Sequence, residues 1–325
     1  MATPGGPPDA DAVALLEACL PAELRGPATS ITRLGGGLSG AAVYRVATAK
    51  GAYVLKVTDA SLPEAAWRQR VEIQRGAADA GVAPRVIHAD AARRAVVSEL
   101  VAARGLAPRL HDPRTRAVTL RLLGGTIRRV HALPLVEPAT WRDPRDLAVA
   151  MRARLATFAV PGFVGAALDD VLAEAPPPSR GPWVTSHNDL NPSNLVFAGE
   201  RLVLLDWDQA GPNDPYYDLA TVAVFLRMDD PTAALLLAAY GTGRSAALPA
   251  GFIYARRLVA ALCASIFCDL ARQGGHPGGD VPLERAPTLA EVHGLIGVGA
   301  LAPAEPAGAW AFALALARTI ATRVA

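Results

Sequence analysis

Three polar residues between positions 189 and 206 have the types and the spacing that phosphoryl transfer requires. Asp189 is followed five residues later by Asn194, and Asp206 follows twelve residues after that. One carboxylate can accept the proton of an attacking hydroxyl, while the other carboxylate and the amide supply oxygen atoms to a magnesium ion on the nucleotide phosphates. The pattern predicts Asp189 as the catalytic base, with Asn194 and Asp206 as metal ligands.

The surrounding residues predict the elements that position these side chains. Residues 183–185 are β-prone, a polar loop broken by Pro192 follows, and apolar residues at 195–197 and 202–205 are separated by a Gly-Glu turn. This order is typical of strand, loop, strand, turn and strand. Asp208 lies two residues beyond Asp206, so alternation along a strand end would send it to the same side. We predict Asp208 as a further metal ligand, and a turn cap is the equally weighted alternative.

Several short motifs in this order carry a family resemblance. Residues 187–194 (HNDLNPSN), 205–208 (LDWD) and 213–220 (NDPYYDLA) resemble the aminoglycoside phosphotransferase and choline/ethanolamine kinase superfamily, and most of all its choline-kinase branch. The alternative, that they are ordinary turn residues, does not require this order across three elements. The resemblance implies that His187 is a packing residue and not a base, and that Asp218 braces the catalytic loop.

The resemblance also implies the fold class. We expect an α/β (α+β) protein with the two-lobed, protein-kinase-like fold of small-molecule kinases. Residues 1–100 would form the nucleotide-binding lobe, with a small antiparallel sheet and one helix. Residues 101–325 would form a mostly helical lobe that carries the catalytic hairpin and the acceptor site.

A glycine-rich segment near the N-terminus predicts a phosphate-binding loop. It contains a literal G-x-G-x-x-G, so a dinucleotide-binding turn is a fair alternative, but that motif must open a helix. The next residues are instead β-prone, which favours a kinase-type loop between two strands. The predicted loop residues are Gly35, Gly36, Gly37, Leu38, Ser39 and Gly40.

Three further positions complete the predicted nucleotide site. Lys56 lies on the third predicted strand, where a lysine reaches the nucleotide phosphates. Glu72, inside the predicted helix 63–80, is the favoured partner of Lys56. Glu64 is the alternative, although a carboxylate in a first turn already suits the helix dipole. The resemblance places the hinge between the lobes at 98–101, with backbone groups of Glu99 and Val101 contacting the adenine.

Composition restricts the class of protein. The chain has 325 residues, of which 51% are hydrophobic and 19% charged, as in a globular protein. A net charge of +2 gives no reason to expect a nucleic acid partner. Three cysteines form no disulfide or zinc pattern, no signal peptide is evident, and the apolar runs are too short for a bilayer. We therefore expect a cytoplasmic protein without a membrane partner, and its oligomeric state is left open.

These observations predict a kinase that uses ATP and Mg²⁺ to phosphorylate a hydroxyl of a small molecule. A choline- or ethanolamine-like amino alcohol is the favoured acceptor, with an aminoglycoside, thiamine or a sugar as alternatives. A quaternary amine would need aromatic walls, and an aminoglycoside would need carboxylates. The C-terminal half offers both, namely Tyr240, Phe252, Tyr254, Phe267, Trp310 and Phe312, and Asp229, Asp230, Asp269 and Glu284. A non-catalytic nucleotide-binding protein and a dinucleotide-dependent oxidoreductase are the alternatives of another class.

Overall fold

The computed structural model describes residues 10–26, 29–34, 41–102, 104–136, 143–177, 181–243 and 247–322. Its contacts group the chain into two compact units. The first contains residues 1–140 and 184–212, and the second contains residues 141–183 and 213–325. The lobe boundary expected at residue 100 lies inside the first unit and stays a prediction.

A five-stranded antiparallel sheet forms one part of the first unit, with the strand order β1-β2-β3-β5-β4. Its strands are β1 (Ser30–Leu34), β2 (Ala42–Thr48), β3 (Gly51–Val57), β4 (Val86–Asp90) and β5 (Ala95–Glu99). The turn between β2 and β3 uses Gly51 at a φ of +142°, a conformation that favours glycine. The sheet confirms the antiparallel arrangement that the sequence predicts around Lys56.

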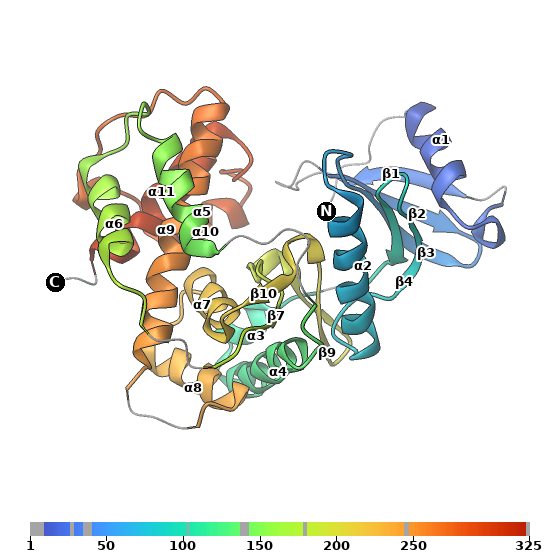
Figure 1. Cartoon of the computed structure of the whole chain (residues 1–325), viewed down its shortest axis with the longest axis horizontal. Helices are drawn as coiled ribbons and strands as arrows, with labels where there is room; N and C mark the ends of the chain where they lie inside the picture. Colours follow the sequence, from blue (N-terminus) through green and yellow to red (C-terminus); the bar gives the residue numbers. More distant parts are fainter. Residues whose placement is uncertain are drawn as a thin grey trace. The chain divides into compact units, whose positions relative to one another are not determined.

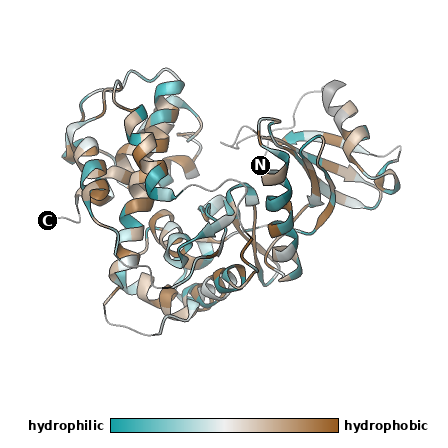
Figure 2. Cartoon of the chain, in the orientation of Figure 1, coloured by the Kyte–Doolittle hydropathy of each residue, from teal (hydrophilic) through white to brown (hydrophobic). Residues whose placement is uncertain are grey.

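The two faces of this sheet have different neighbours. Leu55 of β3 is fully buried in a cluster that includes Leu16 of α1 (Ala10–Cys19) and Leu20 just after this helix. Because side chains alternate along a strand, Lys56 lies on the opposite face. Figure 2 shows both hydrophobic and hydrophilic residues on the strands of this sheet. Helix α2 (Glu64–Asp79) contacts β4 and the segment after β9 (Figure 1).

The catalytic hairpin also belongs to the first unit. In it β8 pairs with β9 and with the short strand β6, while β7 pairs with β10. The helix α4 contacts β7 and β9. The elements of this part are β6 (Arg104–Gly105), α3 (Ala107–His111), α4 (Pro113–His131), β7 (Val184–Ser186), η2 (Pro192–Asn194), β8 (Leu195–Ala198), β9 (Arg201–Leu204), η3 (Trp207–Gln209) and β10 (Gly211–Asn213). Near the N-terminus, the short 3₁₀ turn η1 (Ala22–Leu24) follows α1.

The described part of the second unit is helical and is built around α9 (Ala250–Gln273), which contacts α5, α6, α7 and α11. Its other elements are α5 (Pro144–Arg154), α6 (Gly162–Ala173), α7 (Pro215–Phe225), α8 (Asp230–Tyr240), η4 (Leu283–Arg285), α10 (Leu289–Gly297) and α11 (Pro306–Ala321). Helix α9 is long and apolar enough to cross a bilayer, but 72% of its most apolar stretch is buried inside the protein. It therefore serves as the core helix of this unit.

Candidate active site

The side chain of His187, at the start of the loop that carries Asp189, is held in one orientation by its contacts. Its side chain is fully buried, and its ring packs 4.7 Å from the ring of Trp207. The Leu205 carbonyl, 3.0 Å away, can only accept a hydrogen bond, so Nε2 carries the proton. Nδ1 then accepts from the backbone N–H of Asp189 at 3.3 Å. Both ring nitrogens are occupied, which suits the packing role that the resemblance implies.

The carboxylate of Asp189 is held by two amides of the same loop. Asn191 donates to Oδ1 at 3.0 Å, and Asn194 donates to Oδ2 at 3.0 Å and to the Asp189 carbonyl at 2.8 Å. Burial raises the pKa of Asp189, the hydrogen bond from Asn191 opposes this, and the nearby Asp206 carboxylate raises it further. The geometry thus gives a half-buried, oriented carboxylate that also has a second carboxylate as its neighbour.

Asn194 and Asp206 present oxygen atoms from two linked segments. The backbone N–H of Leu205 donates to the Asn194 carbonyl at 2.9 Å, which ties the end of β9 to the loop. The Asn194 amide nitrogen is used by Asp189, so its side-chain oxygen is left as an acceptor. Asp206 has a φ of 62°, a conformation that is rare outside glycine and gathers at functional sites.

This set of donors fits Mg²⁺. Within the described ranges, no three His, Cys, Asp or Glu side chains come together as a metal cage. Magnesium prefers oxygen ligands and is usually held by one or two carboxylates together with substrate phosphates. One carboxylate and one amide oxygen, from Asp206 and Asn194, are therefore the kind of incomplete protein site that a magnesium–nucleotide complex completes.

Lys56 lies between the two carboxylates that follow β9. Its Nζ is 2.6 Å from Oδ1 of Asp206 and 2.7 Å from Oδ2 of Asp208. Burial alone would lower the pKa of Lys56, but Asp208 and Asp206 outweigh it, so this pKa lies above its usual value. Asp206 and Asp208 do face the same side, as expected. Strand alternation is not the cause, because Asp206 has a left-handed backbone and Asp208 lies in the 3₁₀ turn η3.

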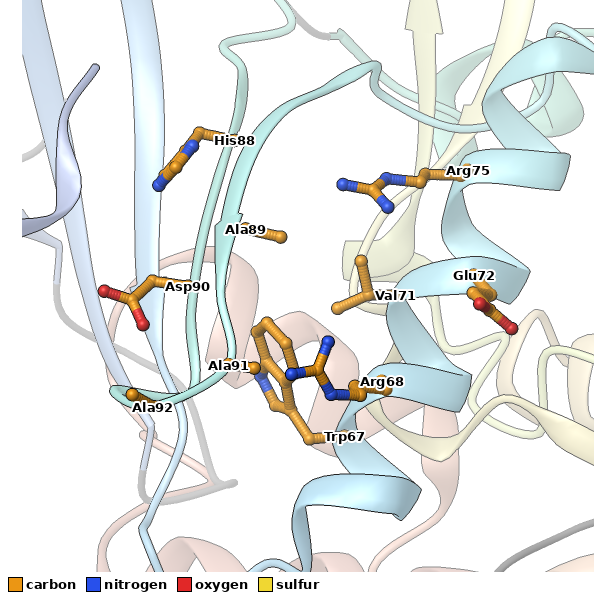
Figure 3. Close-up of a pocket in the computed structure, with 10 residues that line it drawn as sticks. All are labelled: Trp67, Arg68, Val71, Glu72, Arg75, His88, Ala89, Asp90, Ala91 and Ala92. Carbon is orange, nitrogen blue, oxygen red and sulfur yellow. The ribbon is translucent and has the colours of Figure 1, made fainter. Parts of the chain in front are cut away.

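Glu72 does not reach Lys56. Its side chain is exposed, and no ion pair between these two residues occurs in the described chain. Glu72 instead belongs to the lining of a pocket of about 440 Å³ between α2 and β4, together with Trp67 and Arg75 (Figure 3). The alternative, Glu64, pairs with Arg68. The expected partnership of Lys56 with a glutamate of α2 is therefore wrong.

The glycine-rich loop, residues 35–40, lies outside the described residues, but its flanking strands are clear. Leu34 of β1 is paired with Val43 of β2 in an antiparallel hairpin. A strand and not a helix follows the loop, which contradicts the dinucleotide-binding alternative. At the predicted hinge, the Glu99 N–H already donates to the Arg85 carbonyl at 3.0 Å. The backbone of Val101 makes no hydrogen bond to other described residues and is available to a ligand.

Most of the groups proposed to line an acceptor site are occupied within the second unit. Phe267 stacks on Phe312 and Trp310 on His276, with ring centroids 4.7 and 4.8 Å apart, and Phe252 is fully buried. Tyr254 accepts a hydrogen bond from Arg145. Among the carboxylates, Asp269 pairs with Arg154 and Arg272, Asp230 pairs with Arg256, and Asp229 caps α8. These core and pairing roles make them poor walls for a substrate cation.

Two residues at the site were not predicted. Asn191 orients Asp189, although the sequence marks it only as a turn residue before Pro192. Arg70 of α2 is half-buried and interacts electrostatically with Asp208. No local signal distinguishes Arg70 from the other arginines of α2, because its role depends on which face of the helix meets η3.

The sheet, the hairpin and their facing polar groups define a protein-kinase-like α/β fold of the small-molecule kinase class. Residues 30–252 match the phosphotransferase enzyme family, and the chain belongs to that family. The structure resembles a choline/ethanolamine kinase family protein from Mesorhizobium loti, with a TM-score of 0.63 and 21% identity, over 95% of this chain and 99% of the other. At this identity the likeness shows the fold.

Two other solved structures share the fold. An aminoglycoside-3'-phosphotransferase of type VIII is similar with a TM-score of 0.55 and 23% identity, over 78% of this chain and 98% of the other. LicA in complex with AMP is similar with a TM-score of 0.57 and 19% identity, over 85% and 95%. The latter is a relative of this fold that binds an adenine nucleotide.

The curated relatives match over a short stretch. Protein LicA of Haemophilus influenzae is 39% identical over 54 residues, which are 17% of this chain. The matched stretch is about a fifth (20%) of the length of that relative.

Proposed function

We propose that this protein transfers the γ-phosphoryl group of ATP to a hydroxyl of a small amino alcohol of the choline or ethanolamine kind. The phosphotransferase family supports the reaction class. The names of two similar structures support the acceptor, because one is a choline/ethanolamine kinase family protein from Mesorhizobium loti and the other is choline kinase LicA from Streptococcus pneumoniae. The aminoglycoside-3'-phosphotransferase supports the second candidate acceptor.

One observation carries the proposal. Lys56 of the sheet and Asp206 of the hairpin are 2.6 Å apart, and Asp206 is in turn an electrostatic neighbour of Asp189. The residues proposed as phosphate-binding lysine, metal-binding carboxylate and base are thus neighbours, which supports the proposal. Phosphoryl transfer needs little more from a protein than this positioning and charge neutralisation.

Each residue then has a distinct task. Asp189, oriented by Asn191 and Asn194, accepts the proton of the acceptor hydroxyl as its oxygen attacks the γ-phosphorus. Asn194 and Asp206 would hold Mg²⁺, which supplies charge neutralisation of the nucleotide phosphates when bound. Lys56 contacts the phosphates, and residues 35–40 cover them. Val101 and Glu99 are proposed to meet the adenine, with Val101 the better candidate because its backbone is available.

The absence of disulfides among the three cysteines suits a reducing compartment, and we propose that the protein acts in the cytoplasm. Two of the cysteines, Cys19 and Cys268, are buried. Burial raises the pKa of Cys268 to about 12, so this thiol stays protonated and unreactive.

A direct screen tests the function. The purified protein, ATP and Mg²⁺ are incubated with choline, ethanolamine, thiamine, sugars and aminoglycosides, and phosphorylated products are measured by mass spectrometry. We expect product from an amino alcohol, and none from Asp189→Asn above background. Turnover only with an aminoglycoside would replace the acceptor and keep the mechanism. Tight ATP binding without product from any acceptor would favour a non-catalytic nucleotide-binding protein.

Asp206→Asn tests the metal assignment in the same assay. It keeps the shape of the side chain but removes its charge, so the Mg²⁺ concentration needed for half-maximal rate should rise at least about tenfold. The matched control is Asp214→Asn, because Asp214 is the N-cap of α7 and accepts from the Tyr216 N–H at 2.8 Å. An unchanged Mg²⁺ requirement in Asp206→Asn would contradict its role as a ligand.

A further inference from the structure

The ammonium of Lys56 has two carboxylate partners, and both come from the same short segment. Asp206 and Asp208 flank Trp207 at 2.6 and 2.7 Å from Nζ. Trp207 is buried, and its indole N–H donates to the Leu204 carbonyl at 2.9 Å. The segment is therefore anchored, and both carboxylates are held in fixed directions toward β3.

These two carboxylates are not equivalent once a nucleotide is bound. The proposed function makes Asp206 a metal ligand, so its oxygens would then be shared with a divalent cation. A divalent cation beside Asp206 also repels the ammonium of Lys56. Asp208 is the partner that can stay on Lys56 throughout, because its side chain is only 20% exposed and already lies at 2.7 Å.

Helix α2 supplies no carboxylate for this purpose. Glu72 lies in the outer pocket, where Arg75 and Trp67 are its neighbours in the lining (Figure 3). The part of α2 that meets η3 carries Arg70, and Arg70 is half-buried. Burial lowers the pKa of Arg70, and the Asp208 carboxylate opposes this. The charge that α2 directs at the site is consequently positive.

We propose that Asp208 is the positioning residue for Lys56 and not a metal ligand, and that the positive charge of Arg70 on α2 favours this arrangement of Asp208. The anchor of the phosphate-binding lysine thus comes from the metal-binding turn itself, two residues from Asp206. Two cations, Lys56 and Arg70, balance two carboxylates, Asp206 and Asp208, before any ligand binds. This inference rests on the proposed function, since it assigns a role within the same site.

A double-mutant cycle tests the proposal, with kcat/KM for ATP measured in Lys56→Met, in Asp208→Asn and in the combined variant. We expect Asp208→Asn to lower kcat/KM at least about tenfold when Lys56 is present, as for the loss of one charge-assisted hydrogen bond. In the Lys56→Met background the same change should have almost no effect, because Asp208 acts through Lys56. Equal losses in both backgrounds would overturn the proposal.

A binding measurement separates positioning from metal ligation without requiring turnover. Mg²⁺ is titrated by calorimetry into protein with a non-hydrolysable ATP analogue. Asp208→Asn should move the Mg²⁺ affinity by less than about threefold, whereas Asp206→Asn should move it at least about tenfold. A shift in Asp208→Asn as large as that in Asp206→Asn would make Asp208 a ligand and overturn the proposal.

Two variants of α2 provide the matched pair and cover the case in which Asp208→Asn does not fold. Arg70→Gln should lower kcat/KM for ATP when it is made in the parent protein. The same change should have little effect in a protein that already carries Asp208→Asn. Glu72→Gln, two residues along the same helix, should behave like the parent. An impaired Glu72→Gln with an unimpaired Arg70→Gln would overturn the proposal. If the parent protein binds no nucleotide, both the proposed function and this inference are overturned. If the parent is active and Asp208→Asn has the same kcat/KM for ATP, only the inference is overturned.

Discussion

The Nζ of Lys56 lies 2.6 Å from Oδ1 of Asp206, although 150 residues separate them in the chain. This ion pair joins the third strand of the five-stranded sheet to the turn after β9. Both groups are partly buried, with 19% and 35% of their side chains exposed, so water screens their attraction only in part. The pair brings together the groups that we propose bind the phosphates and the metal.

Lys56→Met is expected to remove the phosphate contact while the hydrophobic stem is kept. The kcat/KM for ATP should fall by about 10²-fold or more, since an oriented charge is lost where charge develops. The variant should stay folded, because Leu55 and its core neighbours are on the other face of β3. Steady-state kinetics and circular dichroism check both statements. Kinetics equal to those of the parent would make Lys56 an ordinary strand lysine.

Asp189→Asn is expected to lower kcat by about 10²–10⁴-fold, which is the usual contribution of a positioned base. Nucleotide affinity should change little, because Asp189 is not the main metal ligand. Single-turnover rates on the acceptor found in the screen measure the chemical step directly.

His187→Gln is the matched variant for the rival mechanism, in which the histidine is the base. His187 is buried and bonded to Leu205 and Asp189, so its replacement should lower the free energy of unfolding by about 1–3 kcal/mol. Its kcat should fall less than that of Asp189→Asn. A mild Asp189→Asn beside an inactive but folded His187→Gln would make the histidine the base.

Gly308 near the start of α11 is expected to tolerate no side chain. A Cβ there would lie 1.9 Å from the Ala302 carbonyl oxygen, so the backbone would have to move. Gly308→Ala should lower the free energy of unfolding by about 1–3 kcal/mol. Gly294 is the control, since no atom lies within 4 Å of its built Cβ and it is inside α10. Gly294→Ala should raise the free energy of unfolding by about 0.5–1 kcal/mol in urea denaturation.

His293 on α10 is expected to make the protein less stable as the solution becomes acidic. Burial, together with the Arg227 charge, lowers the pKa of His293 in the folded state. Between the folded and the unfolded pKa the unfolded chain binds more protons, so the free energy of unfolding rises with pH. It should therefore decline as pH falls below about 6.5, the unfolded value.

His293→Gln, which cannot be protonated, serves as the comparison for that pH dependence. The difference in the free energy of unfolding between pH 7.5 and pH 5.5 should be smaller in the variant than in the parent. Urea denaturation at both pH values measures it. An equal difference in the two proteins would mean that other groups cause the acid destabilisation.

The sequence was sufficient for the catalytic hairpin and for the family. Asp189, Asn194 and Asp206 lie on adjoining segments, and short-range turn and strand patterns place them together. The strands around Lys56 could also be predicted, because β-prone residues on both sides of the Lys50-Gly51 turn are local signals. Expected helix boundaries such as 63–80 agree with α2 to within a residue at each end.

Only the tertiary structure showed which residues pair with Lys56. It also showed whether the aromatic residues fill a core or line a pocket. Arg70 and Glu72 are two positions apart, which is about 200° of rotation around a helix, so the face that packs determines which one meets the site. The sequence favoured Glu72 because it is a carboxylate inside the predicted helix and not in its first turn. Likewise, Phe267 and Phe312 could line a pocket or fill a core, and composition cannot distinguish these. Such choices depend on how distant segments pack, which no local pattern records.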